Sequence, residues 1–517
     1  MSVTRKFFSY NDGAEAGAFY KDHEQQYTLT PFIVTFCEDT LADIDVQNFL
    51  EAGLKIIRFR MTHNINEKVV MHEMLKSAIE LCCLKYEVSA WPVATMIDLP
   101  NALVRTGYIK EELNTSALHF KKGHVVEITC DDKYWNKCDL SRIYIDDPQM
   151  MDMIKPKQEI CIPVASLNLI CTEIINKQTI KCEIISNGRV ANYQVVCFRG
   201  LRLKRPPLTN QDLNLLNYAK ENEFAVVVIN SIRRASTAYR AKSFFVGCHK
   251  PLIFGSICEQ EGLDNFDDIL EATDGIVLAR EYISESILNI NQMQAIQLSI
   301  CAKCKRVGKP IFISGDIFDE TVTSGGLSYN EVDDVTNIIL QGAGLMFRST
   351  HSPANVLKSL YLLNYISSTV EQYIEEYHWR LIMELKPPVN AAEAAVIACA
   401  IAARQINATV IIVLTKTGKT VKQLSRITPK SFIVAVATDV SIVEQLYLFH
   451  GVIPIIYDRK EKEDWYMGIK RRIEFAVEHC VNHELLKHHQ PYAVLRKASP
   501  ESAYCDQFSL YTVKRKF

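Results

Sequence analysis

The chain alternates short apolar runs with longer stretches that have the periodicity of amphipathic helices. The spacing between most of the runs leaves room for one helix and two loops, which is typical of strands in a parallel sheet. Eight strand–helix units predict a closed (β/α)8 TIM barrel. The eight runs are Phe32–Phe36, Ile56–Met61, Val93–Asp98, Phe224–Asn230, Leu252–Ile257, Gly275–Arg280, Pro310–Gly315 and Gly344–Ser349.

One interval between the third and fourth runs is too long for a single helix. Segments in it alternate apolar and polar residues, as half-buried strands do: His124–Thr129, Ile160–Thr172 and Thr179–Ile185. This pattern predicts a small β-barrel inserted after the third strand. We expect such an insertion to act as a lid over the carboxyl-terminal mouth of the barrel, where barrel enzymes carry out their chemistry.

The last part of the chain has a different pattern. An alanine-rich helix is predicted at Ala391–Ile406, and strands at Thr409–Thr415, Phe432–Thr438 and Val452–Asp458, with two more within Tyr492–Val513. These elements favour a separate α/β layered domain. The predicted domains are an N-terminal tail (1–27), the barrel (28–104 and 207–375), the lid (105–206) and a C-terminal effector and assembly domain (376–517).

Composition mainly excludes certain partners and locations. A net charge of −2 gives no general attraction to nucleic acid or to an anionic membrane. No apolar run approaches the roughly 20 residues that cross a bilayer, and the polar start lacks the apolar stretch of a secretory signal. The 16 cysteines are scattered, which is typical of reduced thiols. We expect a soluble cytoplasmic protein with neither a nucleic-acid nor a membrane partner.

Four local segments, in this order and spacing, resemble the pyruvate kinase family over roughly residues 28–515. Ala52–Arg58 is similar to the second barrel strand of the family, which ends in a substrate-binding arginine. Asp98 followed by Arg105-Thr106-Gly107, the segment Phe266–Ile276, and Gly308-Lys309-Pro310 match later family segments. The resemblance implies phosphoryl transfer between phosphoenolpyruvate and ADP in glycolysis, with Mg²⁺ and K⁺ as cofactors, in a tetramer.

Several residues that the resemblance makes functional are present. A guanidinium fork suits a phosphoryl group, although the same residues could be remnants that now only form salt bridges. By resemblance, Arg58 and Arg280 bind substrate, His63 and Arg105 lie on the nucleotide side, and Thr62 and Asp98 belong to a degraded monovalent-cation site. Two other cation-site positions are altered to Arg60 and Leu99. The side chain of Arg60 could supply a positive charge in place of a bound ion.

Other family positions have lost their chemistry. Ser256 and Gly315 stand where the family has a lysine and a threonine, and Cys258 and Tyr282 stand where it has metal-binding carboxylates. The neighbours Glu259 and Glu281 are the only nearby substitutes, but alternation along a strand turns Glu259 to the opposite face from Cys258. Losing one preorganised electrostatic group commonly costs about 100- to 1000-fold in rate. The sequence therefore predicts a catalytically impaired pseudoenzyme.

A loop in the C-terminal domain resembles the effector loop that binds sugar bisphosphates in the family. Hydroxyls, a glycine and backbone N–H groups at a helix start suit a phosphate, although an ordinary turn with an N-cap would look the same. The partner loop Ala498–Ala503 lacks the family's arginine and has Glu501 instead. A second phosphate would meet this negative charge, so the sequence favours binding of a single phosphate group. The predicted phosphate residues are Thr415, Thr417, Gly418, Lys419 and Thr420.

Three functions remain open from the sequence. The first is a pseudoenzyme with a regulatory or structural role, in a homotetramer or in a mixed tetramer with pyruvate kinase-type subunits. The second is a slow but functional pyruvate kinase that recruits its metal through Glu259 and Glu281. The third is a small-molecule binding protein that uses the Thr415–Thr420 loop for a sugar phosphate.

Overall fold

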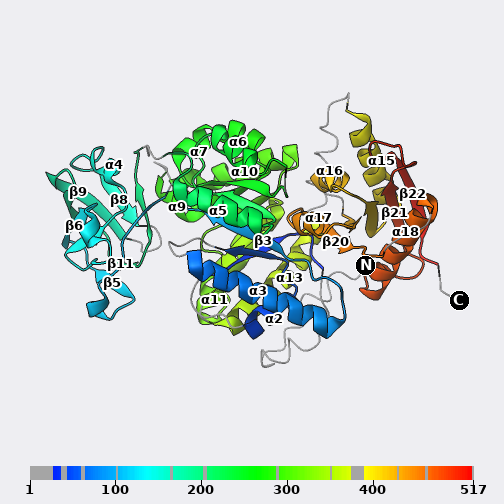
Figure 1. Cartoon of the computed structure of the whole chain (residues 1–517), viewed down its shortest axis with the longest axis horizontal. Helices are drawn as coiled ribbons and strands as arrows, with labels where there is room; N and C mark the ends of the chain where they lie inside the picture. Colours follow the sequence, from blue (N-terminus) through cyan, green and yellow to red (C-terminus); the bar gives the residue numbers. More distant parts are fainter. Residues whose placement is uncertain are drawn as a thin grey trace.

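The structure is a computed structural model of the chain, and it is described for most of its length. Three bodies lie in a row, with a barrel in the middle, an all-β body on one side and an α/β body on the other (Figure 1). The described residues are 27–36, 43–59, 65–100, 103–162, 167–201, 206–247, 249–286, 290–349, 352–373, 389–427, 430–459 and 464–514.

The central body is a closed parallel barrel, as the sequence predicts. Its strand order is β1-β17-β16-β15-β14-β13-β3-β2. The interior is packed with apolar side chains, and Gly275 and Gly344 leave room for the rings of Phe254 and Phe312. The strands are β1 (Phe32–Phe36), β2 (Ile56–Phe59), β3 (Ala94–Leu99), β13 (Val226–Ile229), β14 (Leu252–Ile257), β15 (Gly275–Ala279), β16 (Ile311–Ser314) and β17 (Gly344–Arg348).

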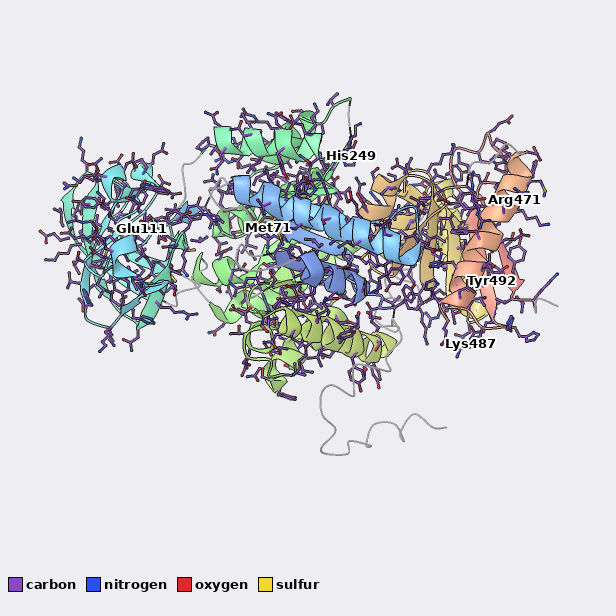
Figure 2. All side chains as sticks on the ribbon, turned by 60° about the horizontal axis from the view of Figure 1, so that its bottom comes forward. Met71, Glu111, His249, Arg471, Lys487 and Tyr492 are labelled. Atoms are coloured by element: carbon purple, nitrogen blue, oxygen red, sulfur yellow. The ribbon has the colours of Figure 1, made fainter. Side chains whose placement is uncertain are left out.

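Helices surround the barrel, and the long helix α3, which carries Met71, runs along its outside (Figure 2). Two of the helices begin with reciprocal capping boxes, Thr209 with Asp212 and Ser328 with Glu331, which satisfy backbone N–H groups that have no partner inside a helix. The helices are α2 (Asp43–Glu51), α3 (Ile65–Tyr86), α5 (Asn210–Glu221), α6 (Ala235–Ser243), α7 (Gln260–Asp264), α8 (Phe266–Ala272), α9 (Arg280–Ser286), α10 (Met293–Val307), α11 (Asp319–Ser324), α12 (Tyr329–Leu340) and α13 (Pro353–Val370).

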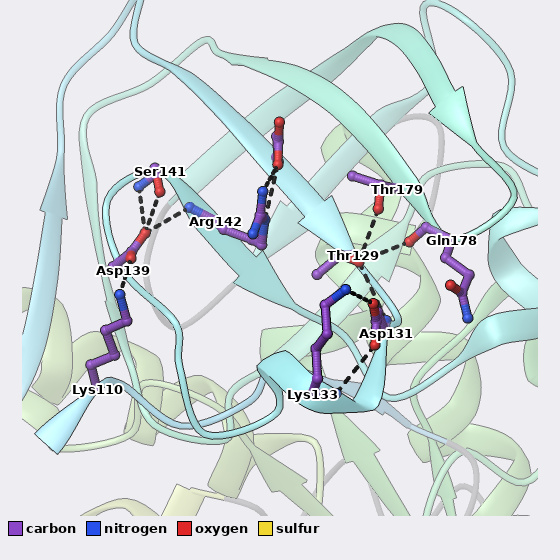
Figure 3. A network of polar contacts seen from close by, with 10 residues as sticks. Lys110, Thr129, Asp131, Lys133, Asp139, Ser141, Arg142, Gln178 and Thr179 are labelled. Atoms are coloured by element: carbon purple, nitrogen blue, oxygen red, sulfur yellow. Dashed lines mark hydrogen bonds and ion pairs between the residues drawn. The ribbon is translucent and has the colours of Figure 1, made fainter.

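The body inserted after β3 is all-β, as predicted. Its main sheet has the order β4-β12-β8-β9-β10-β6-β7, and a bridge between Thr106 and Ile145 joins the two ends. Polar contacts fix its turns, among them the ion pair of Lys110 with Asp139 (Figure 3). The strands are β4 (Val104–Arg105), β5 (Ala117–Phe120), β6 (Val125–Thr129), β7 (Arg142–Tyr144), β8 (Glu159–Ile162), β9 (Leu167–Asn176), β10 (Thr179–Ile184), β11 (Gly188–Ala191) and β12 (Val195–Phe198), with helix α4 at Pro148–Met151.

The C-terminal body is a five-stranded sheet of order β20-β19-β18-β21-β22 with helices packed against it. This confirms the predicted α/β layered domain. Its strands are β18 (Val410–Leu414), β19 (Phe432–Ala437), β20 (Val452–Ile456), β21 (Pro491–Arg496) and β22 (Gln507–Thr512), and its helices are α15 (Ala391–Gln405), α16 (Lys419–Ile427), α17 (Val440–Leu446) and α18 (Trp465–Asn482).

The C-terminal body packs against the end of the barrel at which the strands begin. The amide of Gly451 donates to the Leu29 carbonyl at 2.6 Å, and the Gln445 side-chain amide donates to the Lys250 carbonyl at 2.9 Å. One buried apolar cluster runs from the barrel interior into this domain. None of the helices in the described ranges has both the length and the apolar character needed to cross a membrane.

Candidate active site

A hollow of about 510 Å³, partly open to solvent, lies at the carboxyl ends of the barrel strands. This is the end where barrel enzymes place their chemistry. Basic and acidic side chains both reach it, so it could hold a charged ligand. Its polar lining consists of Thr35, Arg58, Glu281, Tyr282, Ser314, Asp316, Asp319 and Arg348.

Arg58, the predicted phosphoryl-binding residue, forms a nearly buried ion pair with Asp98. Its Nε and Nη2 lie 2.9 and 2.5 Å from the two carboxylate oxygens of Asp98, in a bidentate arrangement. The amide of Asn230 also donates to Asp98, at 3.1 Å. The carboxylate of Asp98 is therefore paired with a guanidinium and accepts a further hydrogen bond from Asn230, and its role as a monovalent-cation ligand stays a prediction.

Arg280, the other predicted substrate-binding residue, also has a carboxylate partner. Its two terminal nitrogens lie 2.7 and 2.6 Å from the carboxylate oxygens of Asp334 on α12. The same guanidinium donates to the Gly315 carbonyl at 2.9 Å. These contacts tie the start of α9 to the end of β16, and a role for Arg280 toward substrate stays a prediction.

The end of β14 carries no charged group at the positions where the family has its lysine and glutamate. Ser256 and Cys258 face the same way, as alternation requires, with their Oγ and Sγ atoms 3.4 Å apart. Both residues are buried. Burial raises the pKa of the Cys258 thiol to about 12, and the carboxylates of Glu281 and Glu259 add to the rise. Cys258 is therefore a neutral thiol, a poor ligand for Mg²⁺.

Tyr282, at the position of the second metal-binding carboxylate, belongs to the same apolar cluster as Cys258. The cluster also contains Leu103, Val195 and Ala279, and all five side chains are buried. Val195 lies on strand β12 of the inserted domain, so the cluster joins the lid to the barrel. A divalent cation needs oxygen ligands, and the five side chains of this cluster include no carboxylate.

Glu281 follows Arg280 and turns toward β16. Its carboxylate accepts a hydrogen bond from the Ser314 hydroxyl, with the nearer oxygen at 3.1 Å. A Cβ atom on Gly315 would lie 2.6 Å from Glu281 Oε2, and Gly315 has φ of +100°. The space of a side chain at position 315, where the family has threonine, is therefore taken by Glu281.

Glu259 stands at the N-cap position of α7, without a capping hydrogen bond from its side chain. Its Oε1 accepts a hydrogen bond from the Ser231 hydroxyl at 2.5 Å. Within the ranges that the structure describes, no group of three or more His, Cys, Asp or Glu side chains has the arrangement of a metal site. Metal binding by the pair Glu259 and Glu281 stays a prediction.

Arg105, predicted on the nucleotide side, is buried in the lid. Its guanidinium lies 4.7 Å from the centre of the Tyr193 ring, and its Nη1 donates to the Tyr193 carbonyl at 3.3 Å. Tyr193 in turn stacks on Tyr108. A cation over an aromatic face is attracted by the ring quadrupole, so the lid holds Arg105 by two contacts with one residue.

Several predicted positions lie outside the described residues. They are His63 and Thr62, and the altered cation-site residue Arg60.

The predicted phosphate loop lies between β18 and α16, where a parallel-strand connection should place it. The Gly418 amide donates to the Thr415 hydroxyl at 2.9 Å, and Gly418 has φ of +72°. The Thr420 hydroxyl contacts Cys505, so the loop adjoins the segment that replaces the family's arginine. Phosphate binding by Thr417, Lys419 and their neighbours stays a prediction.

The structure adds partners that sequence reasoning missed. Asp334 forms an ion pair with Arg280, and Asn230 donates to Asp98, the partner of Arg58. Arg348 pairs with Asp319 at the end of β17. Arg348 could have been anticipated, because it ends a predicted barrel strand. Asp334 lies within a helix and its sequence neighbours give no signal.

Comparisons with known proteins agree with this architecture. A family model described as the pyruvate kinase barrel domain matches residues 28–356, and one described as the pyruvate kinase alpha/beta domain matches residues 393–503. Pyruvate kinase 2 of Saccharomyces cerevisiae is 26% identical, covering 88% of this chain and 89% of its own length. Pyruvate kinase of Schizosaccharomyces pombe is 24% identical, covering 89% and 90%. The chain belongs to the pyruvate kinase family.

Proposed function

We propose that this chain is a catalytically impaired pyruvate kinase-like protein with a regulatory or structural role. One observation carries the proposal: the two metal-ligand positions, Cys258 and Tyr282, belong to a buried apolar cluster that joins lid and barrel. The family reaction builds negative charge on phosphoryl and enolate oxygens, which a metal ion normally stabilises. An apolar cluster provides no such stabilisation, and Ser256 does not replace the family's lysine.

The cationic groups that remain give weak binding of the family's substrates at most. Arg58 and Arg280 are each paired with a carboxylate, so a phosphoryl group would have to compete with Asp98 and Asp334. We therefore expect phosphoenolpyruvate and ADP or ATP to bind weakly. A tetramer, alone or with active subunits, and a cytoplasmic location follow from the family and are part of the proposal.

A coupled assay of pyruvate formation tests the impairment. The full chain would be supplied with phosphoenolpyruvate, ADP, Mg²⁺ and K⁺, beside the Saccharomyces cerevisiae relative as a control. Because the lysine and both metal-binding carboxylates of the family are replaced, and one such group alone is worth about 100- to 1000-fold, we expect a rate at least about 1000-fold lower than that of the relative. A rate within about tenfold of the relative would overturn the proposal.

A slow kinase with displaced metal ligands is the second candidate, and one observation favours it. The carboxylates of Glu259 and Glu281 both act on the Cys258 thiol electrostatically, so they flank the position of the missing ligand. If they recruit a metal, Glu259→Gln and Glu281→Gln should each abolish the residual rate. Glu261→Gln is the matched control on the same helix, because Glu261 pairs with the exposed side chain of Arg234. Rates unchanged in the first two variants would rule this candidate out.

A further inference from the structure

A second hollow lies at the opposite end of the barrel, where the C-terminal body packs against the starts of the strands. Its empty space, partly open to solvent, is about 480 Å³. One wall comes from the end of α10 and the following turn, and the other from the end of α16 and the segment before β20. The two bodies meet closely here, because a Cβ atom on Gly308 would lie 2.9 Å from Cβ of Arg426.

The charged side chains of this pocket are all basic. Lys305 and Lys309 reach it from the barrel, and Arg426 and His450 from the C-terminal domain, while no Asp or Glu is among its lining residues. Arg426 Nη1 lies 2.8 Å from Glu393, and the Lys309 ammonium donates to the Leu270 and Glu271 carbonyls. The lining itself therefore offers basic groups and no carboxylate to a ligand.

Burial disfavours the charged forms of two of these basic groups. Burial lowers the pKa of Lys305 to about 7, with the nearby Cys301 thiol acting in the opposite sense. Burial also lowers the pKa of His450 to about 3, and Lys305 lowers it further. An anion in the pocket would reverse these shifts, because an opposite charge at close range favours the charged forms.

We propose that this pocket binds a small tetrahedral oxyanion, such as the phosphate group of a metabolite, between α10 of the barrel and α16 of the C-terminal domain. Lys305 and Arg426 supply the charge, and the Ser425 hydroxyl, which donates to the His450 carbonyl at 2.7 Å, fixes the segment that carries the histidine. The site is independent of the barrel mouth and of the Thr415–Thr420 loop. Because it contacts both bodies, its occupancy would hold them in one relative position.

Calorimetric titration of the full chain with inorganic phosphate at pH 8 tests the site. We expect saturable binding that takes up a proton, because Lys305 is mostly neutral at this pH in the free protein and becomes charged beside the anion. The proton appears as a dependence of the measured heat on the ionisation enthalpy of the buffer. Lys305→Met should weaken binding at least about tenfold, whereas Arg306→Met, an exposed neighbour on the same helix, should leave it unchanged.

Two further variants separate this site from its alternatives. Lys305→Arg should still bind phosphate but with less proton uptake, since a guanidinium is already charged; this variant also serves if Lys305→Met does not fold. Lys419→Met should leave the binding intact, because Lys419 belongs to the other loop. Unchanged affinity in Lys305→Met, loss of binding in Lys419→Met, or no saturable binding in the unaltered chain would overturn the proposal.

Discussion

At the scale of single residues, opposite charges at the mouth of the barrel form ion pairs with each other. The side chains of Arg58 and Asp98 are 12% and 1% exposed, so their charges interact with little screening. Both were predicted from the sequence to bind ions, one a phosphoryl group and the other a cation. Paired in this way, each satisfies the other, which explains how the barrel mouth tolerates them without ligands.

Asp98→Asn tests how much the fold depends on this pair. The substitution leaves the Arg58 guanidinium in the barrel without its counter-charge, and such losses cost about 3–5 kcal/mol. We expect a fall of that size in the free energy of unfolding, measured by urea denaturation at pH 7. Glu51→Gln is the control, since it removes the more exposed pair with Lys85 and should change stability little. Equal effects of the two substitutions would contradict the account.

The partners of these residues mark the limit of sequence reasoning. Asp98 meets Asn230 across 132 residues, and Arg280 meets Asp334 across 54. The positions at strand ends follow from the eight apolar runs, so Arg58, Asp98, Cys258 and Arg280 could be placed from sequence. Which carboxylate pairs with each arginine depends on how the side chains of neighbouring strands pack. No local sequence pattern encodes this packing.

At the scale of elements, the strands were predictable because the barrel interior imposes an unbroken apolar run. All residues of β14 and β15 are buried, which produces such runs. The lid was predicted less completely: strands β4, β5, β7, β11 and β12 were missed, since none is longer than four residues and so short a segment shows little alternation. The run Ile160–Thr172 proved to be two strands, β8 and β9, on either side of the segment 163–166.

One side chain from α9 takes part in the contact between the lid and the barrel. Tyr282 packs with Leu103 and Val195, so Tyr282→Ala should leave a gap in the cluster that joins the two bodies. Truncating a buried aromatic side chain costs about 3–5 kcal/mol. We expect faster amide hydrogen exchange in β12, measured by mass spectrometry, while β18 in the C-terminal domain serves as the internal control. Unchanged exchange in β12 would show that the cluster does not hold the lid.

Helix α17 makes the stability of the whole chain depend on pH. Burial raises the pKa of Glu444 to about 8, with Glu223 and Asp439 adding to the rise. The folded state therefore holds a proton that the unfolded state releases, and this residue's contribution to stability falls as pH rises from about 4.5 to 8. Glu444→Gln should raise Tm at pH 8 more than at pH 5. An equal shift at both values would show that Glu444 is ionised in the folded protein.

At the scale of the whole molecule, the family architecture is intact, and we propose that its chemistry is impaired. Barrel, lid and C-terminal domain keep the expected order, because each is specified by many apolar positions that packing maintains independently of catalysis. The catalytic positions are few, and replacing Cys258 and Tyr282 by side chains of the family's type would put charge into an apolar cluster. Under this proposal, the chain retains the fold of the family without its reaction.

The central claim is that no divalent cation binds at the carboxyl ends of β14 and β15. Titration of the full chain with Mn²⁺, followed by electron paramagnetic resonance of the free ion, measures this directly, with the Saccharomyces cerevisiae relative as the positive control. The account predicts no tight stoichiometric Mn²⁺ binding to this chain, with or without phosphoenolpyruvate. One tightly bound Mn²⁺ per chain, lost in Glu259→Gln or Glu281→Gln, would contradict it.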